Sequence, residues 1–254
     1  MTFQRYVALG DSFTEGVGDP DPMRPNGWRG WADRVAEALA ASAGPQFGYA
    51  NLAIRGRKLP AIIDEQLEPA LALEPDLVTI HGGGNDVLRP RADIDALAAR
   101  YDEAVGRLAG SGARVVMFTI ADPGLNPVMR LIRGRTAIFN EWAREIAERH
   151  DATLVDLWRM RGWKVAEILD EDRLHLNAVG HQGIAIAVLD ALGVSHQLEP
   201  LTPAAAPALS SAEQRRADIA WARQHLAPWI HRRVTGRSSG DGVTPKWPTL
   251  TPIA

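Results

Sequence analysis

Cysteine is absent from this 254-residue chain, which excludes disulfide bridges, thiolate metal sites and a cysteine nucleophile. A basic excess is absent too: the formal net charge is -3, so the chain as a whole has no bulk attraction to nucleic acid or acidic membranes. No apolar run approaches the roughly 18 residues that a membrane-spanning helix needs. The first residues lack the basic and apolar regions of a secretory signal, and no Asn-x-Ser/Thr acceptor occurs. We therefore expect a cytoplasmic protein with no nucleic-acid partner.

What is present is a full complement of core-forming residues. Hydrophobic residues make up 46% of the chain and charged residues 23%, which is typical of a globular protein. Apolar runs predict strands at 6–9, 47–52, 76–81, 114–120 and 153–156, and helical periodicity falls between and after them. This alternation favours parallel βαβ units, and therefore an α/β fold in the form of a three-layer α/β/α sandwich.

Glycine-rich turns follow the first three predicted strands. Gly10-Asp11-Ser12 ends the first, a loop centred on Gly56 follows the second, and Gly83-Gly84-Asn85-Asp86 follows the third. The carboxyl ends of parallel strands share one edge of a sheet, where open α/β sheets bind ligands. We therefore expect Ser12, Gly56 and Asn85 to converge although they are distant in sequence.

These turns, with a segment near residue 172, supply what serine-based acyl transfer needs. A serine nucleophile requires a base for its proton and a carboxylate that orients the base, and Asp172 and His175 are three residues apart. The tetrahedral intermediate also needs hydrogen-bond donors. The backbone N–H groups of Ser12 and Gly56 and the carboxamide of Asn85 can supply three.

In this combination and order, the motifs resemble the GDSL, or SGNH, hydrolase family over about residues 5 to 192. They are Gly10-Asp11-Ser12, Gly56, Gly83-Gly84-Asn85-Asp86 and Asp172-Arg173-Leu174-His175. The resemblance implies Ser12 as nucleophile, His175 as base, Asp172 as its orienter, and an oxyanion hole of Ser12, Gly56 and Asn85. It also implies a flavodoxin-like, five-stranded parallel sheet in the order 2-1-3-4-5. The expected activity is hydrolysis of small acyl esters or acetylated sugars through an acyl-enzyme, without cofactor or metal.

Several other interpretations remain open at this point. The same fold could transfer the acyl group to a sugar or alcohol, or bind carbohydrate without catalysis. Asp11 and Asp86 could serve glycosidase chemistry, although we expect them to support the site by accepting backbone N–H bonds. The loop arginines could recognise an anionic substrate, although we expect them to be solvated loop charges; they are Arg55, Arg57, Arg89 and Arg91. Gly236-Arg237-Ser238-Ser239-Gly240 fits the Gly-x-Ser-x-Gly elbow of another hydrolase fold, but it lacks the preceding strand and a later histidine. His175 and His181 lack a nearby third metal ligand.

The composition changes after Val194, which divides the chain into a hydrolase domain at 1–195 and a C-terminal extension at 196–254. Proline-rich sequence predicts a linker, and Ser210 with Glu213 forms a capping-box pattern that begins a helix ending at about Val234. An apolar stripe on this helix predicts docking, with the hydrolase domain or a second copy of the chain as the two candidate partners. We expect this contact to lie away from Ser12 and to serve stability. Residues 235–254 are expected to be irregular.

Overall fold

The structure is a computed structural model that describes residues 2–125, 129–160, 165–204 and 209–253. Strand β1 (Arg5–Leu9) lies inside the sheet, and its side chains alternate between the two faces. Val7 and Leu9 enter one apolar core, whereas Tyr6 and Ala8 enter the other. The unbroken apolar run thus reflects a strand that is covered on both faces.

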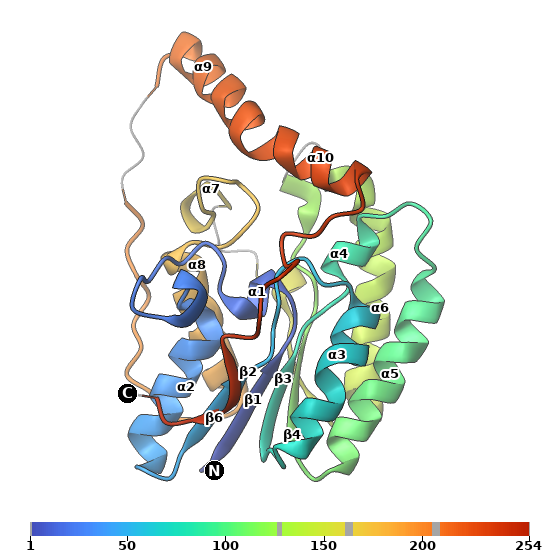
Figure 1. Cartoon of the computed structure of the whole chain (residues 1–254), viewed down its shortest axis with the longest axis vertical. Coiled ribbons are helices and arrows are strands. Elements are labelled where there is room, and N and C mark those ends of the chain that lie inside the picture. The colour runs from blue at the N-terminus through green and yellow to red at the C-terminus, as the bar shows by residue number, and fades with distance from the viewer. Residues whose placement is uncertain (1, 126–128, 161–164, 205–208, 254) are drawn as a thin grey trace.

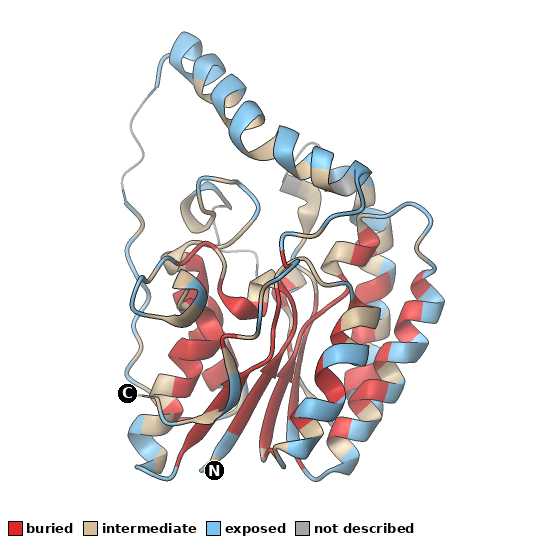
Figure 2. Cartoon of the chain, in the orientation of Figure 1, coloured by how far each residue is buried: buried red, intermediate tan, exposed pale blue. Residues whose placement is uncertain are grey.

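The layers are those of a three-layer α/β/α sandwich (Figure 1). The other strands are β2 (Gly48–Asn51), β3 (Leu77–Ile80), β4 (Arg114–Phe118), β5 (Thr153–Val155) and β6 (Trp247–Thr251). One face carries α2 (Gly30–Ala43) and α8 (Ala178–Ala191), and the other carries α3 (Leu59–Ala72), α5 (Ile94–Gly110) and α6 (Arg133–Arg149). The short helices in the loops are α1 (Ser12–Glu15), η1 (Pro25–Gly27), α4 (Gly84–Val87), η2 (Pro123–Leu125), η3 (Met129–Ile132), η4 (Leu157–Arg159) and α7 (Val165–Ile168). Figure 2 shows strands β1 to β4 buried between the two helical layers. Within the described ranges, no helix is long and apolar enough to cross a bilayer.

The predicted strand order is confirmed for the first five strands, but the sheet has a sixth. The order is β5-β4-β3-β1-β2-β6, with β1 to β5 parallel and β6 antiparallel to β2. The prediction that residues 235–254 are irregular is therefore wrong. Strand β6 contains Pro248, which an edge strand tolerates because one side of its backbone needs no ladder hydrogen bonds. Its strand conformation depends on pairing with β2, a non-local contact.

The extension also contains the expected helix, which is continuous from α9 (Ser211–Trp221) through a π-helical turn, η5 (Ala222–Leu226), to α10 (Ala227–Val234). The capping box is confirmed: Ser210 Oγ accepts a hydrogen bond from Glu213 N, and the Glu213 carboxylate accepts one from Ser210 N. The apolar stripe, however, is not deeply buried. Ile219 remains 55% exposed and Ile230 46% exposed, so the helix lies over the molecule without entering its core.

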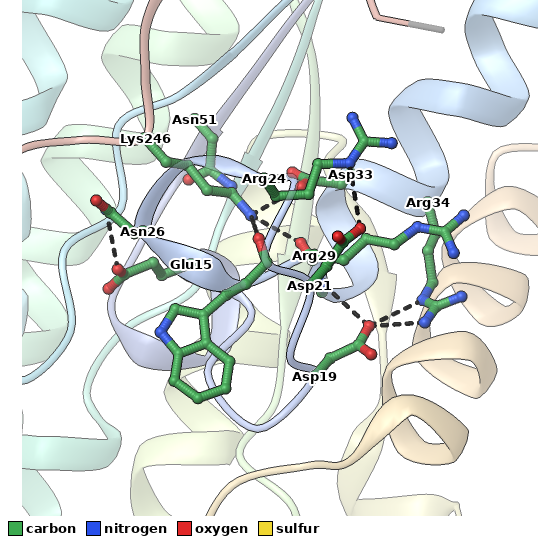
Figure 3. A network of polar contacts seen from close by, with 12 residues as sticks. Glu15, Asp19, Asp21, Arg24, Asn26, Arg29, Asp33, Arg34, Asn51 and Lys246 are labelled. Atoms are coloured by element: carbon green, nitrogen blue, oxygen red, sulfur yellow. Dashed lines mark hydrogen bonds and ion pairs between the residues drawn. The ribbon is translucent and has the colours of Figure 1, made fainter.

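The tail is anchored by the side chain of Lys246, which is fully buried just before β6 (Figure 3). Its Nζ donates hydrogen bonds to the carbonyl oxygens of Trp28 and Arg29 and to Asp33 Oδ2, at 3.1, 2.7 and 2.9 Å. The other carboxylate oxygen of Asp33 accepts a bond from Tyr49. Burial raises the pKa of Asp33 and lowers the pKa of Lys246, and the attraction between the two charges opposes both shifts. The tail is therefore tied to α2 by an ion pair that has no access to water.

Removing one partner of the Lys246–Asp33 ion pair should destabilise the fold. We expect Lys246→Met to lower the free energy of unfolding by about 3–5 kcal/mol, because the Asp33 carboxylate would be left buried without its partner. Adding Asp33→Asn should recover part of the loss, because no charge would then remain buried. Urea denaturation of the three proteins measures both effects. A loss below about 1 kcal/mol for Lys246→Met would show that the pair does not anchor the tail.

Candidate active site

Ser12 is placed by a sharp turn at the carboxyl end of β1. Gly10 has a φ of +155°, and a Cβ atom there would lie 2.4 Å from Thr14 Oγ1 and 2.9 Å from the carbonyl oxygen of His81. Only glycine lets the chain turn this closely against β3. Asp11 then caps α1, since its Oδ1 accepts a hydrogen bond from Phe13 N at 3.1 Å. Ser12 consequently begins α1 on the wall of a large cleft.

Asp172 and His175 form a hydrogen-bonded pair on the same cleft. His175 Nδ1 lies 2.5 Å from Asp172 Oδ2, and Asp172 Oδ1 accepts bonds from the backbone N–H groups of Leu174 and His175, both at 2.9 Å. Although partial burial raises the pKa of Asp172, these hydrogen bonds and the histidine charge outweigh it and hold the pKa well below its ordinary value. The carboxylate is therefore charged at neutral pH and fixes the orientation of the imidazole.

The turn after α1 brings His175 to the Ser12 side of the cleft. A Cβ atom at Gly18 would lie 2.2 Å from the carbonyl oxygen of Leu176 and 3.1 Å from His175 Cβ, so the two segments are in close contact. In the part of the chain that the structure describes, no hydrogen bond joins Ser12 Oγ to the imidazole. Such bonds are often long in a free enzyme and shorten when substrate binds.

Asn85 connects the turns that follow β1, β2 and β3. Its Nδ2 donates to Asp11 Oδ2 at 3.0 Å and to the carbonyl oxygen of Arg57 at 2.9 Å. An oxyanion would have to compete with these two acceptors for the amide hydrogens. The neighbouring Asp86 accepts a bond from Leu59 N at 2.9 Å and fixes the start of α3; burial raises its pKa. Asp11 and Asp86 thus both accept backbone N–H groups.

Gly56 lies against the C-terminal tail, a contact that was not predicted. It has a φ of +75°, and a Cβ atom there would lie 2.4 Å from Ser238 Oγ and 3.0 Å from Ser239 Oγ. Ser238 follows a helix and a turn, and its Oγ accepts a hydrogen bond from Gly240 N at 3.2 Å. The strand that a Gly-x-Ser-x-Gly elbow requires before its serine is replaced here by α10.

Two buried histidines lie close to the site. His181 Nδ1 accepts a hydrogen bond from Trp31 N, and its Nε2 donates one to the Val17 carbonyl oxygen. Burial lowers the pKa of His181 to about 4. His81 packs on Phe13 with ring centroids 4.5 Å apart, but its Nδ1 has no hydrogen-bond partner among the described residues. Asp11 Oδ1 lies 3.9 Å from this nitrogen, beyond hydrogen-bond distance. Within the described ranges, no three His, Asp or Glu side chains are grouped to hold a metal ion.

The cleft has a volume of about 1580 Å³. Of the loop at 14–29, only Val17 lines it, while Trp31 is wholly buried in the core. Met129 to Arg133 line another part of it.

Comparison with known proteins identifies the family. The model of the GDSL-like lipase/acylhydrolase family matches residues 8–182, which include Ser12, Gly56, Asn85, Asp172 and His175. The chain belongs to this family. It is accordingly a hydrolase that cleaves ester bonds. No curated protein matches the chain.

Solved structures share the fold of this GDSL-like hydrolase. LAE5, an α/β hydrolase from the metagenome of Lake Arreo, is 25% identical with a TM-score of 0.62, over 75% of this chain and 95% of that one. The acetylxylan esterase Axe2 from Geobacillus stearothermophilus is 20% identical with a TM-score of 0.61, over 76% of this chain and 96% of Axe2. The esterase EstA from Pseudoalteromonas sp. is 19% identical with a TM-score of 0.57, over 75% of this chain and 97% of EstA.

The extension of this GDSL-like hydrolase lies beyond the family match, and it reaches the same cleft. Trp229, Arg232 and Ser238 line the cleft together with Ser12 and His175. Farther along the helix, Trp221 Nε1 donates to the carbonyl oxygen of Asp172 at 3.1 Å. The prediction that the extension packs away from Ser12 is therefore wrong. The apolar stripe suggested docking on the core, but the helix is held by Trp221 and by an Arg173–Asp218 ion pair at 2.8 Å.

The pairing of Asp172 with His175 gives a direct test. We expect Asp172→Asn to reduce kcat for an ester by about 10⁴-fold, because the amide favours the wrong imidazole tautomer while preserving shape; the magnitude is that of the same change in another serine hydrolase. Steady-state kinetics on 4-nitrophenyl acetate measure the effect. As a matched control, Asp218→Asn removes a carboxylate of the extension that does not touch the imidazole, and a ten-fold or smaller difference between the two variants would contradict the assignment.

Proposed function

We propose that the protein is a serine esterase that hydrolyses carboxylic esters through an acyl-enzyme. The observation that supports this most strongly is the 2.5 Å contact between His175 Nδ1 and Asp172 Oδ2 on the cleft that Ser12 lines. A non-catalytic binding domain would have no need for an oriented imidazole beside a strand-end serine. The printed names of Axe2 and EstA, both esterases, favour the same activity.

Acylation begins when Ser12 Oγ attacks the ester carbonyl and His175 Nε2 takes the hydroxyl proton. Asp172 keeps the Nδ1–H of the imidazole in place and stabilises the imidazolium. The oxyanion is bound by Ser12 N, Gly56 N and Asn85 Nδ2. As the tetrahedral intermediate collapses, the C–O bond to the alcohol breaks and His175 returns the proton to the leaving oxygen.

Deacylation repeats these steps with water as the nucleophile. His175 takes a proton from water, the hydroxide oxygen adds to the acyl carbonyl, and the proton then goes to Ser12 Oγ as the acid leaves. If an alcohol or sugar hydroxyl took the place of water, the same site would transfer the acyl group. Product analysis with and without added glycerol distinguishes the two outcomes, since an acylated glycerol forms only by transfer.

The assignment of the nucleophile is tested by two serine variants. We expect Ser12→Ala to lower kcat for 4-nitrophenyl acetate on the order of 10⁶-fold, as removal of the nucleophile does in another serine hydrolase. Ser238→Ala is the control, because Ser238 is the other serine that a Gly-x-Ser-x-Gly reading would favour. Loss of turnover in Ser238→Ala with activity retained in Ser12→Ala would overturn the proposal.

The role of Asn85 is tested separately. We expect Asn85→Ala to cost roughly 10²–10³ in kcat, the usual loss for one oxyanion donor. Thermal unfolding of the same variant reports how much its bonds to Asp11 and Arg57 stabilise the turns. A change confined to KM would mean that Asn85 binds substrate equally in the ground and transition states, and would exclude oxyanion donation.

A further inference from the structure

The catalytic cleft has a charge opposite to that of the chain. The whole sequence carries a net charge of -3. By contrast, nine Lys and Arg side chains line the cleft against three carboxylates, those of Asp11, Glu65 and Asp122. A cleft lined with one sign of charge focuses its field and raises the local concentration of oppositely charged solutes. The cleft is therefore suited to an anionic molecule.

Four of the nine cations are neutralised by a neighbouring carboxylate. The pairs are Arg55–Glu15, Arg57–Glu65, Arg133–Asp122 and Arg173–Asp218, at 2.5, 2.8, 2.8 and 2.8 Å. The other five, Lys58, Arg89, Arg130, Arg232 and Arg237, have no carboxylate partner among the described residues. Because no neighbouring carboxylate balances their charges, these five account for the positive excess of the cleft lining.

Two of the five, Arg232 and Arg237, belong to the C-terminal extension, and the other three come from loops of the hydrolase domain. The backbones of these two arginines are held together, because Arg237 N donates to the carbonyl oxygen of Arg232 at 3.0 Å. Guanidinium groups match the planar oxygens of carboxylate and phosphate with two parallel hydrogen bonds. The extension thus adds cationic donors to a cleft that is also lined by cations from loops of the hydrolase domain.

The remaining lining of the cleft is largely apolar. Leu131 is 83% exposed and Leu174 43% exposed, and both line the cleft with Ile120, Trp158 and Trp229. Apolar side chains that stay exposed in a cleft gain free energy when a ligand covers them. The cleft therefore offers both an apolar surface and a positive field.

We propose that the natural substrate is an amphiphilic ester that carries a carboxylate or phosphate, and that Arg232 and Arg237 of the extension bind this group. The proposal rests on the proposed esterase function and names the substrate class of the same site. The anion belongs to either the acyl or the alcohol part of the ester. At either position the arginines would bind the anion in the same way. Test substrates that carry the anion on one part or the other distinguish the two positions.

The test compares pairs of esters in which one member carries a carboxylate and the other is neutral. On the acyl side, mono-4-nitrophenyl adipate is compared with 4-nitrophenyl hexanoate, and on the alcohol side, 4-acetoxybenzoate with 4-acetoxybenzamide, each corrected for uncatalysed hydrolysis. We expect wild type to have a higher kcat/KM for the anionic member of at least one pair. Raising the salt concentration should reduce that preference, because exposed charges are screened.

Variants of the extension assign the preference to particular residues. In Arg232→Gln/Arg237→Gln, the anionic-to-neutral ratio of kcat/KM should fall about ten- to hundred-fold, the range expected for lost charge-assisted hydrogen bonds. Arg216→Gln is the matched control, since Arg216 is an exposed arginine of the same extension outside the cleft lining; its ratio should stay within about two-fold of wild type.

The outcomes separate this proposal from the esterase function. Hydrolysis of the neutral esters without preference for either anionic partner would overturn the anion-binding role while leaving the esterase intact. An equal loss of kcat/KM for the anionic and the neutral ester in the double variant would also overturn it. The arginines would then support the fold or the apolar wall of the cleft, and would not bind the anion. Absence of hydrolysis with all four esters would instead count against the proposed function.

Discussion

The geometry of the site depends on the amide of Asn85, which joins three turns that the sheet brings together but does not itself connect. Strands β1, β2 and β3 are neighbours and parallel, so the loops after them begin at one edge. The two hydrogen bonds from Asn85 Nδ2 link the Asp11 turn and the Arg57 carbonyl to α4. Asp86, the next residue, fixes the start of α3. Asn85 and Asp86, two consecutive residues of the turn after β3, are thus hydrogen-bonded to the loops that carry Ser12 and Gly56. These bonds fix the positions of the two loops.

The C-terminal extension is held very differently at its two ends. Lys246 and β6 are built into the molecule through a water-excluded ion pair and a sheet pairing. In the helix that runs from α9 to α10, none of the described α9 residues is buried. This helix contacts the rest of the molecule mainly through aromatic and charged side chains. A wall of this kind alters the lining of the cleft without taking part in the core, which is how loops and additions diversify substrates on a shared fold.

Local signals in the sequence predicted most of the hydrolase domain. The unbroken apolar strands and the glycine turns at their ends both depend on residues that are neighbours in the sequence. Strand β6 and the buried Lys246 could not be found this way, because each is defined by partners about 200 residues earlier. The helix after Ser210 was predicted from its capping box, but its position was not. An apolar stripe indicates that a helix docks, and says nothing about which surface it covers.

The central claim, that Ser12 is the nucleophile within an oxyanion hole made by three turns, is tested most directly by a crystal structure after reaction with a fluorophosphonate. Phosphorus should be bonded to Ser12 Oγ, with the phosphoryl oxygen about 2.7–3.1 Å from Ser12 N, Gly56 N and Asn85 Nδ2. This result would also show whether Asn85 releases Asp11 to bind the oxyanion. An adduct on Ser238, or a phosphoryl oxygen remote from Gly56 and Asn85, would contradict the account.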